Sequence, residues 1–119
     1  MELNSIAFIP DGNRRYAKLA GYSLGETYYH GTQKAWEVIN WMKNYPEVKF
    51  GTFYTLSLEN LRRSKPELKI LFRIFEKELD KVKGQPIIEE GDIRLRFMGR
   101  KEMFPESIRK KMLAAEELT

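Results

Sequence analysis

The stretch IAFIPDGNRRYAKLAG, residues 6–21, changes character within a few residues. An apolar run at residues 5–9 predicts a short buried strand, and residues 13–20 predict a short helix that Gly21 can terminate. The Asp-Gly pair between them ordinarily indicates a hairpin, but no second strand follows it directly. The sequence therefore predicts a strand that passes into a helix through a carboxylate, a glycine, an amide and two guanidinium groups.

Hydrophobic periodicity predicts an α/β fold for the whole chain. Residues 93–99 alternate Ile, Leu and Phe with Arg, Arg and Met, residues 50–56 are rich in aromatic and β-branched side chains, and residues 21–31 resemble a loop with three glycines. Helices are predicted at residues 13–20, 32–43, 65–83 and 105–118, and strands at residues 5–9, 50–56 and 93–99. The order β-α-α-β-α-β-α predicts a parallel β-sheet flanked by helices.

The composition excludes several kinds of site. The 119 residues suit a single domain over residues 1–119, and 42% hydrophobic with 32% charged residues indicates a folded chain. The absence of cysteine and the presence of one histidine exclude disulfides, thiolate metal sites and multi-histidine zinc sites. The sequence has no signal-peptide pattern and no apolar run of membrane length, so the cytoplasm is the expected compartment. A net charge of +4 suits an anionic partner without demanding nucleic acid.

A group of small and polar residues lies where the first predicted strand meets the helix. Gly12 lets the backbone approach a ligand, Asn13 can cap the helix, and Arg14 and Arg15 add positive charge to an electropositive helix end. These features predict an anion site, with phosphate as the obvious anion. Asp11 would repel phosphate unless a cation lay between them, and Mg²⁺ is bound by one or two carboxylates together with phosphate oxygens. A plain turn with a helix cap and solvated arginines is the alternative.

A second polar cluster, TLSLENLRRSKPE at residues 55–67, follows the second predicted strand. It offers Ser57, Glu59, Asn60 and Arg63 just before a helix. Parallel strands end at the same edge of a sheet, where ligands bind, so we expect the two clusters to share one site. A polar loop with a capping role is the alternative.

These two segments resemble the leading motifs of the cis-prenyltransferases, the family of undecaprenyl diphosphate synthase. IAFIPDGNRRYAK is similar to a hydrophobic strand followed by D-G-N-x-R-[WY]-A, and FYTLSLENLRRSKPE is similar to aromatic-x-[FL]-S-x-E-N-x-x-R. IRLRFMGR and the ending AAEELT also resemble the family at the expected spacing. The resemblance therefore covers essentially the whole chain.

The resemblance implies an enzyme, a prenyltransferase of isoprenoid biosynthesis. Members of this family add isopentenyl diphosphate to an allylic diphosphate and form a cis double bond with each addition. Asp11 matches the essential aspartate that works with Mg²⁺ at the diphosphates, and Asn60 matches an asparagine proposed to help remove the proton, so both are expected catalytic residues. Position 28, where many members carry a histidine, is a tyrosine. The resemblance assigns substrate binding to Gly12, Asn13, Arg14, Arg15, Tyr16, Tyr28, Ser57, Glu59 and Arg63.

The family's second half has no counterpart in these 119 residues. There an R-x-x-x-x-x-R-x-S-like segment and a distal glutamate bind isopentenyl diphosphate and magnesium. We therefore expect the amino-terminal half of a synthase, completed by a missing carboxyl-terminal half or by a partner in a homodimer or heteromer that completes the sheet. The resemblance also implies a lipid product and peripheral contact with the inner face of the membrane. A non-catalytic partner subunit of a synthase complex is the alternative, and no nucleic-acid partner is expected.

Overall fold

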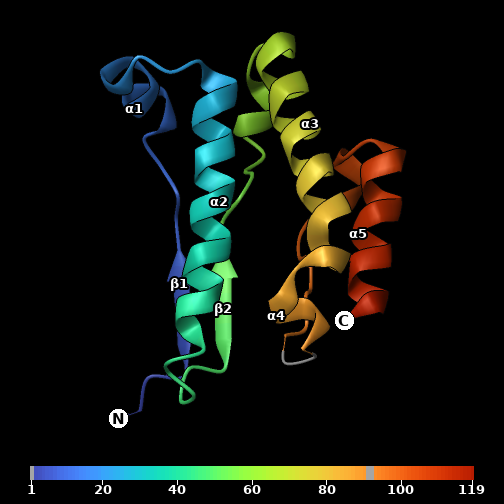
Figure 1. The fold of residues 1–119 in the computed structure, drawn as a ribbon. Helices are drawn as coiled ribbons and strands as arrows, with labels where there is room; N and C mark the ends of the chain where they lie inside the picture. Colours follow the sequence, from blue (N-terminus) through green and yellow to red (C-terminus); the bar gives the residue numbers. More distant parts are fainter. Residues whose placement is uncertain (1, 91–92) are drawn as a thin grey trace. The chain divides into compact units, whose positions relative to one another are not determined.

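The computed structural model describes residues 2–90 and 93–119, which form two compact units. The first unit extends to Leu68, and the second runs from Lys69 to Thr119 (Figure 1). The boundary between the units falls within one helix, residues 65–81, and each unit has its own buried side chains. Among the helices of these two described ranges, none is long and apolar enough to cross a membrane.

The first unit is built on a two-stranded parallel sheet. Its elements are β1 (Ser5–Phe8), α1 (Asn13–Ala20), α2 (Leu24–Met42), β2 (Phe50–Phe53) and the short 3-10 helix η1 (Asn60–Arg62). β1 pairs with β2 in parallel, with Phe8 opposite Phe53, so both strands end at the same edge. The connection between the strands contains α2, which runs alongside the sheet in Figure 1. The predicted α/β class with a parallel sheet is confirmed.

Glycines set both ends of α1. Gly12 precedes the helix with a φ of 84° and Gly21 follows it with a φ of 71°, values that other residues rarely adopt. The N–H of Gly21 donates to the carbonyl oxygen of Ala17 and ends the helix, as the sequence predicted. The expected cap at Asn13 was wrong: Gly12 takes the N-cap position, so Asn13 is the first helical residue and no described side chain caps this end.

The predicted loop at residues 21–31 was wrong over most of its length, because α2 already begins at Leu24. Ser23 caps this helix, and its Oγ accepts from the N–H of Glu26 at 3.1 Å. Two glycines lie inside α2, where each costs about 1 kcal/mol relative to alanine. The cap and the long packed helix outweigh that cost. As a result Tyr28 lies on a helix instead of a loop.

The strands are shorter and less buried than the sequence predicted. β1 ends at Phe8 and β2 at Phe53, where residues 9 and 56 were expected. In β1, Ile6 and Phe8 are half-buried, whereas Ser5 and Ala7 are exposed. Successive side chains of a strand point to opposite faces, so among the described residues only one face of β1 is packed. The prediction of a buried strand was therefore wrong for its second face.

The second unit is helical. α3 (Lys65–Lys81) leads into it, followed by η2 (Val82–Gly84), α4 (Pro86–Glu89), η3 (Lys101–Met103) and α5 (Glu106–Leu118). Its core is formed by side chains that are at most 8% exposed: Leu79, Val82, Ile87, Ile88, Ile108, Met112 and Ala115. The predicted helices at residues 65–83 and 105–118 are thus confirmed with small changes at their ends.

Residues 93–99 do not form the predicted strand. Their side chains do alternate between half-buried and exposed, and the ring of Phe97 meets that of Phe75 edge-on at 6.2 Å. The N–H of Leu95, however, donates to Oγ1 of Thr119 at 2.9 Å. A strand needs a ladder of backbone hydrogen bonds to a partner strand, and no described residue supplies one to this segment. The alternation therefore reflects a segment that is packed on one side.

Replacing Ile108 with alanine is expected to lower the free energy of unfolding by about 2–5 kcal/mol, because the side chain is 1% exposed and its loss leaves a cavity. Leu113 lies on the same helix and is 57% exposed, so Leu113→Ala should change the stability by about 0.5 kcal/mol or less. Urea unfolding followed by circular dichroism measures both. Equal losses in the two variants would contradict the packing described for α5.

Candidate functional site

The turn between β1 and α1 places one carboxylate at an electropositive helix end. Asp11 is exposed, and its Oδ1 accepts from the N–H of Gly12 at 2.7 Å. Its Oδ2 has no hydrogen-bond partner among the described residues. The first N–H groups of α1 have no acceptor within the helix, and the helix dipole adds partial positive charge. The turn can therefore bind an anion through the N–H groups at the start of α1 and a cation through the Asp11 carboxylate.

The two adjacent arginines of this turn are used differently. Arg14 donates from Nε and Nη2 to the two carboxylate oxygens of Glu67, at 3.2 and 3.0 Å. Arg15 has no hydrogen bond or ion pair with any described residue, and its Nη2 lies 3.7 Å from the place that a Cβ on Gly12 would occupy. The guanidinium of Arg15 thus has no described partner, whereas that of Arg14 is paired with the carboxylate of Glu67.

Glu67 joins several elements into one group, the Glu67 cluster, which consists of Arg14, Tyr28, Arg63 and Glu67. Its Oε1 accepts from Nη1 of Arg63 and from the hydroxyl of Tyr28, both at 3.1 Å. The Tyr28 oxygen in turn accepts from Nη1 of Arg63 at 2.7 Å. The side chains of Glu67 and Arg63 are 12% and 25% exposed, so both charges are largely withdrawn from water. Charges in such surroundings need close partners, and the cluster provides them.

The hydroxyl of Tyr28 holds its proton more firmly than that of a free tyrosine. Burial is the largest cause and raises the pKa of Tyr28 above 10.0, while the Arg63 guanidinium opposes the rise. The hydrogen bond to Glu67 and its negative charge raise the pKa further. At neutral pH Tyr28 is therefore a neutral phenol that donates to Glu67 and accepts from Arg63.

The loop after β2 is closed by two reciprocal hydrogen bonds. The N–H of Ser57 donates to Oδ1 of Asn60 and the N–H of Asn60 donates to Oγ of Ser57, each at 3.1 Å. The Nδ2 group of Asn60 has no partner among the residues that the structure describes. Glu59, between them, is exposed. The loop therefore fixes the Asn60 side chain and leaves its amide donors available.

The two polar segments leave the same edge of the sheet, as predicted. β1 and β2 are parallel and in register, and Asp11 and Ser57 follow their ends by a few residues. Within the described ranges no hydrogen bond or ion pair joins Asp11 to Asn60 directly. The direct link between the segments is the Glu67 cluster, which connects Arg14 of the first segment to Arg63 of the second.

Two other predicted site residues lie outside this cluster. Tyr16 is 53% exposed, and its ring lies 6.2 Å from the ring of Tyr22. Oδ1 of Asn13 lies 3.8 Å from the position of a Cβ on Gly31, and therefore beside α2. Both residues belong to α1, so they stay close to the turn even though neither joins the Glu67 cluster.

Sequence reasoning missed Glu67. It is the last residue of the second polar cluster, TLSLENLRRSKPE, and the sequence predicted no role for it. Its spacing of four residues from Arg63 on a helix-like stretch is a signal for an ion pair. Its bond to Arg14, 53 residues away, has no such local signal.

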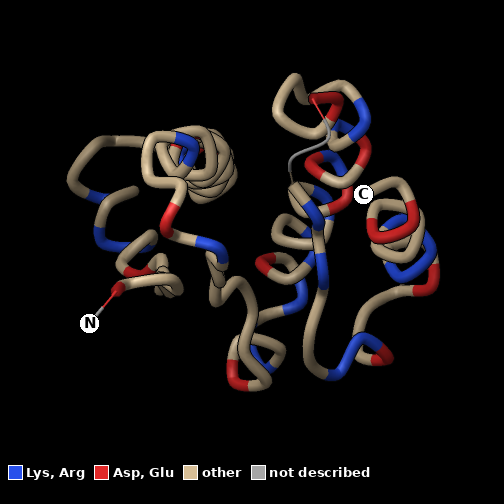
Figure 2. The backbone as a smooth tube through the Cα atoms, turned by 90° about the horizontal axis from the view of Figure 1, so that it is seen from below, with Lys and Arg blue, Asp and Glu red and all other residues tan. Residues whose placement is uncertain are grey.

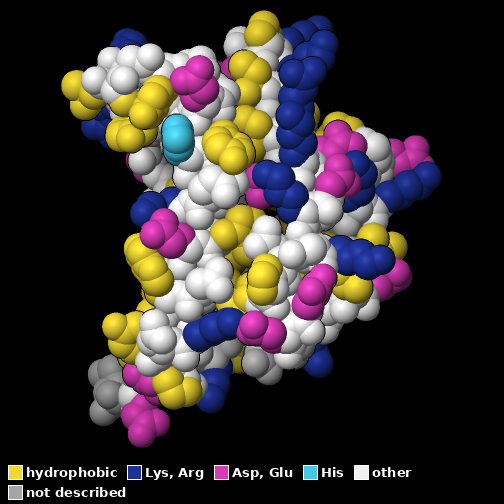
Figure 3. Space-filling view, viewed as in Figure 1, with side chains coloured by type: hydrophobic (Ala, Val, Ile, Leu, Met, Phe, Trp, Pro, Cys, Tyr) yellow, Lys and Arg dark blue, Asp and Glu magenta, His cyan; other side chains and the backbone are white. Residues whose placement is uncertain are grey.

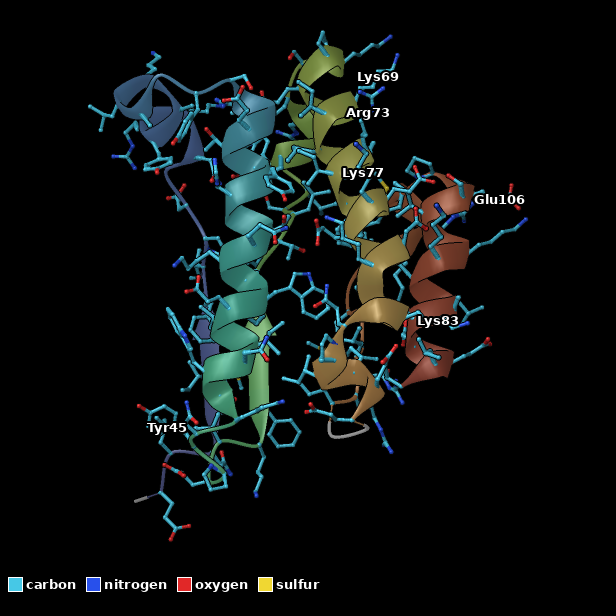
Figure 4. The ribbon with its side chains drawn as sticks, viewed as in Figure 1. Tyr45, Lys69, Arg73, Lys77, Lys83 and Glu106 are labelled. Atoms are coloured by element: carbon cyan, nitrogen blue, oxygen red, sulfur yellow. The ribbon has the colours of Figure 1, made fainter. Side chains whose placement is uncertain are left out.

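Positive charge is not confined to this site. Figure 2 shows Lys and Arg interspersed with Asp and Glu along the backbone. Figure 3 shows basic side chains in a column over α3, and in Figure 4 the labelled Lys69, Arg73 and Lys77 project from successive turns of that helix. These three are exposed and form no ion pair with a described residue. They offer matched controls for the arginines of the turn.

Metal-binding groups do not cluster in the described parts of the chain. Across residues 2–90 and 93–119, no three His, Cys, Asp or Glu side chains come together in a way that could hold a metal ion. Asp11, with one unpartnered oxygen, supplies a single carboxylate. This fits a cation that takes most of its ligands from phosphate and water, as Mg²⁺ does, and does not fit an all-protein metal site.

Stability should fall as the pH rises above about 10, because the folded state holds the Tyr28 proton more tightly than the unfolded state does. The contribution is fully present below the pKa of an unfolded tyrosine and is lost as the pH passes through the raised pKa of the folded state. Lys111, whose pKa is also raised, acts in the same direction. Urea unfolding of the parent and of Tyr28→Phe at pH 8 and pH 11 separates the contribution of Tyr28 from that of Lys111. The variant should lose less stability than the parent between these pH values. An equal loss would mean that Tyr28 does not contribute.

The comparisons with known proteins agree with one another. The model of the undecaprenyl diphosphate synthase family matches residues 9–119. The tritrans,polycis-undecaprenyl-diphosphate synthase (geranylgeranyl-diphosphate specific) of Pyrobaculum aerophilum is 43% identical over 114 residues, which are 96% of this chain and 48% of that protein. An isoprenyl transferase of Thermus thermophilus is 36% identical over 105 residues, or 87% of this chain and 40% of that protein.

A solved structure of a prenyl diphosphate synthase is also similar to this chain. Lavandulyl diphosphate synthase from Lavandula x intermedia, in complex with dimethylallyl diphosphate, superposes with a TM-score of 0.83 and 30% identity. The match covers 98% of this chain and 49% of that one. The chain therefore belongs to the undecaprenyl diphosphate synthase family of prenyltransferases. It spans about half the length of the relatives that it matches.

Proposed function

We propose that this chain carries the allylic-diphosphate part of a cis-prenyltransferase active site. The reaction adds isopentenyl diphosphate to an allylic diphosphate and forms a cis double bond. The observation that carries the proposal is the set of free donors at one sheet edge: the whole guanidinium of Arg15, and Nε and Nη2 of Arg63. Guanidinium groups of this kind suit the oxygens of a diphosphate. The resemblance of the solved relative, which holds dimethylallyl diphosphate, supports the same ligand class.

The residues of the turn would bind the diphosphate. Gly12 and Asn13 would present backbone N–H groups at the start of α1, and Arg15 would neutralise charge. Stabilising the charge that develops on the departing diphosphate lowers the barrier to ionisation of the allylic substrate. Tyr16 would lie beside the bound substrate at the rim of the site.

Mg²⁺ fits Asp11 as a single carboxylate ligand, with phosphate oxygens and water completing its coordination. A bound Mg²⁺ supplies Lewis-acid stabilisation of the diphosphate. Asp11 would orient that ion at the turn through an oxygen that no protein donor uses.

The loop after β2 would act at the reacting carbons. Asn60 is held by Ser57 and keeps free amide donors, which would bind a diphosphate oxygen and place that oxygen to accept the proton lost from isopentenyl diphosphate. Glu59 is exposed beside them and would contact the substrate.

A non-catalytic partner subunit of a synthase complex is the second candidate. One observation favours it: among the described residues, no three His, Cys, Asp or Glu side chains come together to hold a metal ion. In either case we propose that a second polypeptide segment, in one chain, a homodimer or a heteromer, completes the sheet. The proposed setting is the cytoplasm or the inner face of the membrane, because the product would be a lipid.

A chimera distinguishes the two candidates. This chain would replace the matching half of the Pyrobaculum aerophilum relative, and elongation would be assayed with radiolabelled isopentenyl diphosphate, geranylgeranyl diphosphate and Mg²⁺. Chain elongation by the chimera is the expected result. A folded chimera that makes no product, when the parent relative does, would favour the non-catalytic role.

A further inference from the structure

We propose that Glu67 is a positioning residue of the diphosphate site. Its carboxylate holds one edge of the Arg63 guanidinium, so that the other edge is presented to phosphate, and it removes Arg14 and Tyr28 from direct contact with the substrate. This inference rests on the proposed function and deepens it. It gives different roles to the three arginines that the resemblance assigned to substrate binding. Arg63 would bind in a fixed orientation, Arg15 would bind without a protein partner, and Arg14 would hold Glu67 in place.

The hydrogen bonds of Arg63 show how the orientation is fixed. Both of its bonds in the Glu67 cluster use the same nitrogen, Nη1, which donates to the Tyr28 oxygen at 2.7 Å and to Oε1 of Glu67 at 3.1 Å. Its Nε and Nη2 have no partner among the described residues. Because the guanidinium is planar and is held through Nη1, its Nε and Nη2 donors stay side by side in one plane. That is the fork that matches two oxygens of a phosphate.

The charges explain why an acid is needed at this place. Arg14 and Arg63 both donate to the same oxygen of Glu67, at 3.2 and 3.1 Å, so two like charges lie close together. Without the carboxylate they would repel each other and separate. With it, two cations and one anion leave a cluster of net charge +1, which still attracts a diphosphate.

Tyr28 acts as a bridge inside the cluster. Its hydroxyl donates its single proton to Glu67 and accepts from Arg63, so it has no donor left for a phosphate. Arg14 likewise donates from Nε and Nη2 to Glu67. Of the three arginines that the resemblance assigned to substrate binding, Arg15 and Arg63 therefore remain as direct ligands, while Arg14 and the phenol of Tyr28 support them.

A rival account makes the opposite prediction. If the Glu67 carboxylate simply occupied the place of the diphosphate, the ligand would have to displace it, and withdrawing the carboxylate would strengthen binding. Glu67→Asp separates the two accounts, because it keeps the negative charge and shortens the side chain by one methylene group. Long-range attraction is then unchanged, and only the position of the carboxylate differs.

The experiment is calorimetric titration of the full chain with dimethylallyl diphosphate, in parallel with thermal unfolding. Glu67→Asp is expected to weaken binding about tenfold, the effect of losing one well-made charged hydrogen bond. Glu37→Asp is the matched control, since Glu37 forms a 2.7 Å surface ion pair with Lys34 on α2 outside the cluster. It should bind as the parent does. Unchanged or tighter binding by Glu67→Asp overturns the proposal.

A second readout needs no ligand. In a ¹³C NMR titration of labelled tyrosine, Glu67→Asp should lower the pKa of Tyr28, because the carboxylate that helps to raise it has withdrawn. An unchanged Tyr28 pKa would show that Glu67 does not hold the cluster, and would overturn the proposal even without binding data. A parent chain that binds no diphosphate would instead overturn the proposed function and the ligand role of Glu67 together.

If Glu67→Asp does not fold, Glu67→Gln takes its place. It keeps the side-chain length but loses the charge that holds two guanidinium groups together. Its binding is compared with the parent at about 1 M salt, where long-range attraction is screened. Weaker binding supports the positioning role, and equal or tighter binding overturns it.

Discussion

Asp11→Asn in the chimera with the Pyrobaculum aerophilum relative is expected to reduce prenyl transfer by at least about 100-fold, the loss that follows removal of one group that stabilises charge in a transition state. Asp11 offers a cation the only carboxylate oxygen of the turn that no described donor uses. Asparagine keeps an oxygen that can accept from the N–H of Gly12, so the turn should survive the change. The measurement is incorporation of radiolabelled isopentenyl diphosphate over a range of Mg²⁺ concentrations.

Asp80→Asn is the matched control for this change. Asp80 is an exposed carboxylate that pairs with Lys111 at 2.8 Å in the second unit, so its variant loses the same charge at another place. We expect it to keep near-parental activity. An Asp11→Asn chimera with a normal rate, or one that is fully restored by excess Mg²⁺, would remove the role proposed for Asp11 in the chemistry.

Replacing both Arg15 and Arg63 with alanine is expected to abolish detectable binding of dimethylallyl diphosphate. Each hydrogen bond to a charged group contributes about 1.5–3 kcal/mol, so the pair together should lower the affinity by about 100-fold or more. The fold should persist, because Arg15 has no partner among the described residues and Glu67 keeps its bidentate bond to Arg14 when Arg63 is removed. Titration calorimetry with and without Mg²⁺ measures the loss.

The double variant Arg73→Ala and Lys77→Ala tests whether charge alone explains binding. Both residues are exposed on α3, pair with no described residue, and carry the same total charge as Arg15 and Arg63 (Figure 4). A local site predicts that this control binds within about twofold of the parent. If the two double variants lose affinity equally, the ligand responds to the net charge of the chain and the site at the turn does not exist.

Local signals predicted the first motif well. The bounds of α1 follow from its composition and from Gly21, which can adopt the positive φ that ends a helix. The parallel arrangement followed from the alternation of strands and helices, and with it the shared edge of the two polar segments. The ends of α1 depend on residues close in sequence, and the parallel arrangement follows from the order of the elements, so the sequence could show both.

Other features depend on competition between local signals. The Ser23 and Glu26 pair is a helix-start signal, but three nearby glycines favour a loop, so the sequence predicted a loop over the first two turns of α2. The alternation at residues 93–99 is real, but a period of two shows only that one side is packed; it cannot show that a partner strand exists.

The Glu67 cluster could not be predicted in full, for a different reason. The spacing of Arg63 and Glu67 is visible in the sequence, but the contacts with Arg14 and Tyr28 cross 53 and 39 residues. Such contacts depend on how the helices meet, which no short pattern determines. The residue that organises the site was therefore the one for which no role was expected.

The parallel pairing of β1 with β2 also sets the order in which the first unit can form. Every residue of β1 pairs with a residue 45 positions later, as Ser5 does with Phe50. A ribosome that adds about 5–20 residues per second needs roughly 2–9 seconds to supply that distance, during which β1 has no strand to join. α1 and α2 can begin to form in this interval, because a helix needs only nearby residues and assembles in about a microsecond. During synthesis α1 and α2 can therefore begin to form before β1 and β2 pair and align the two motifs.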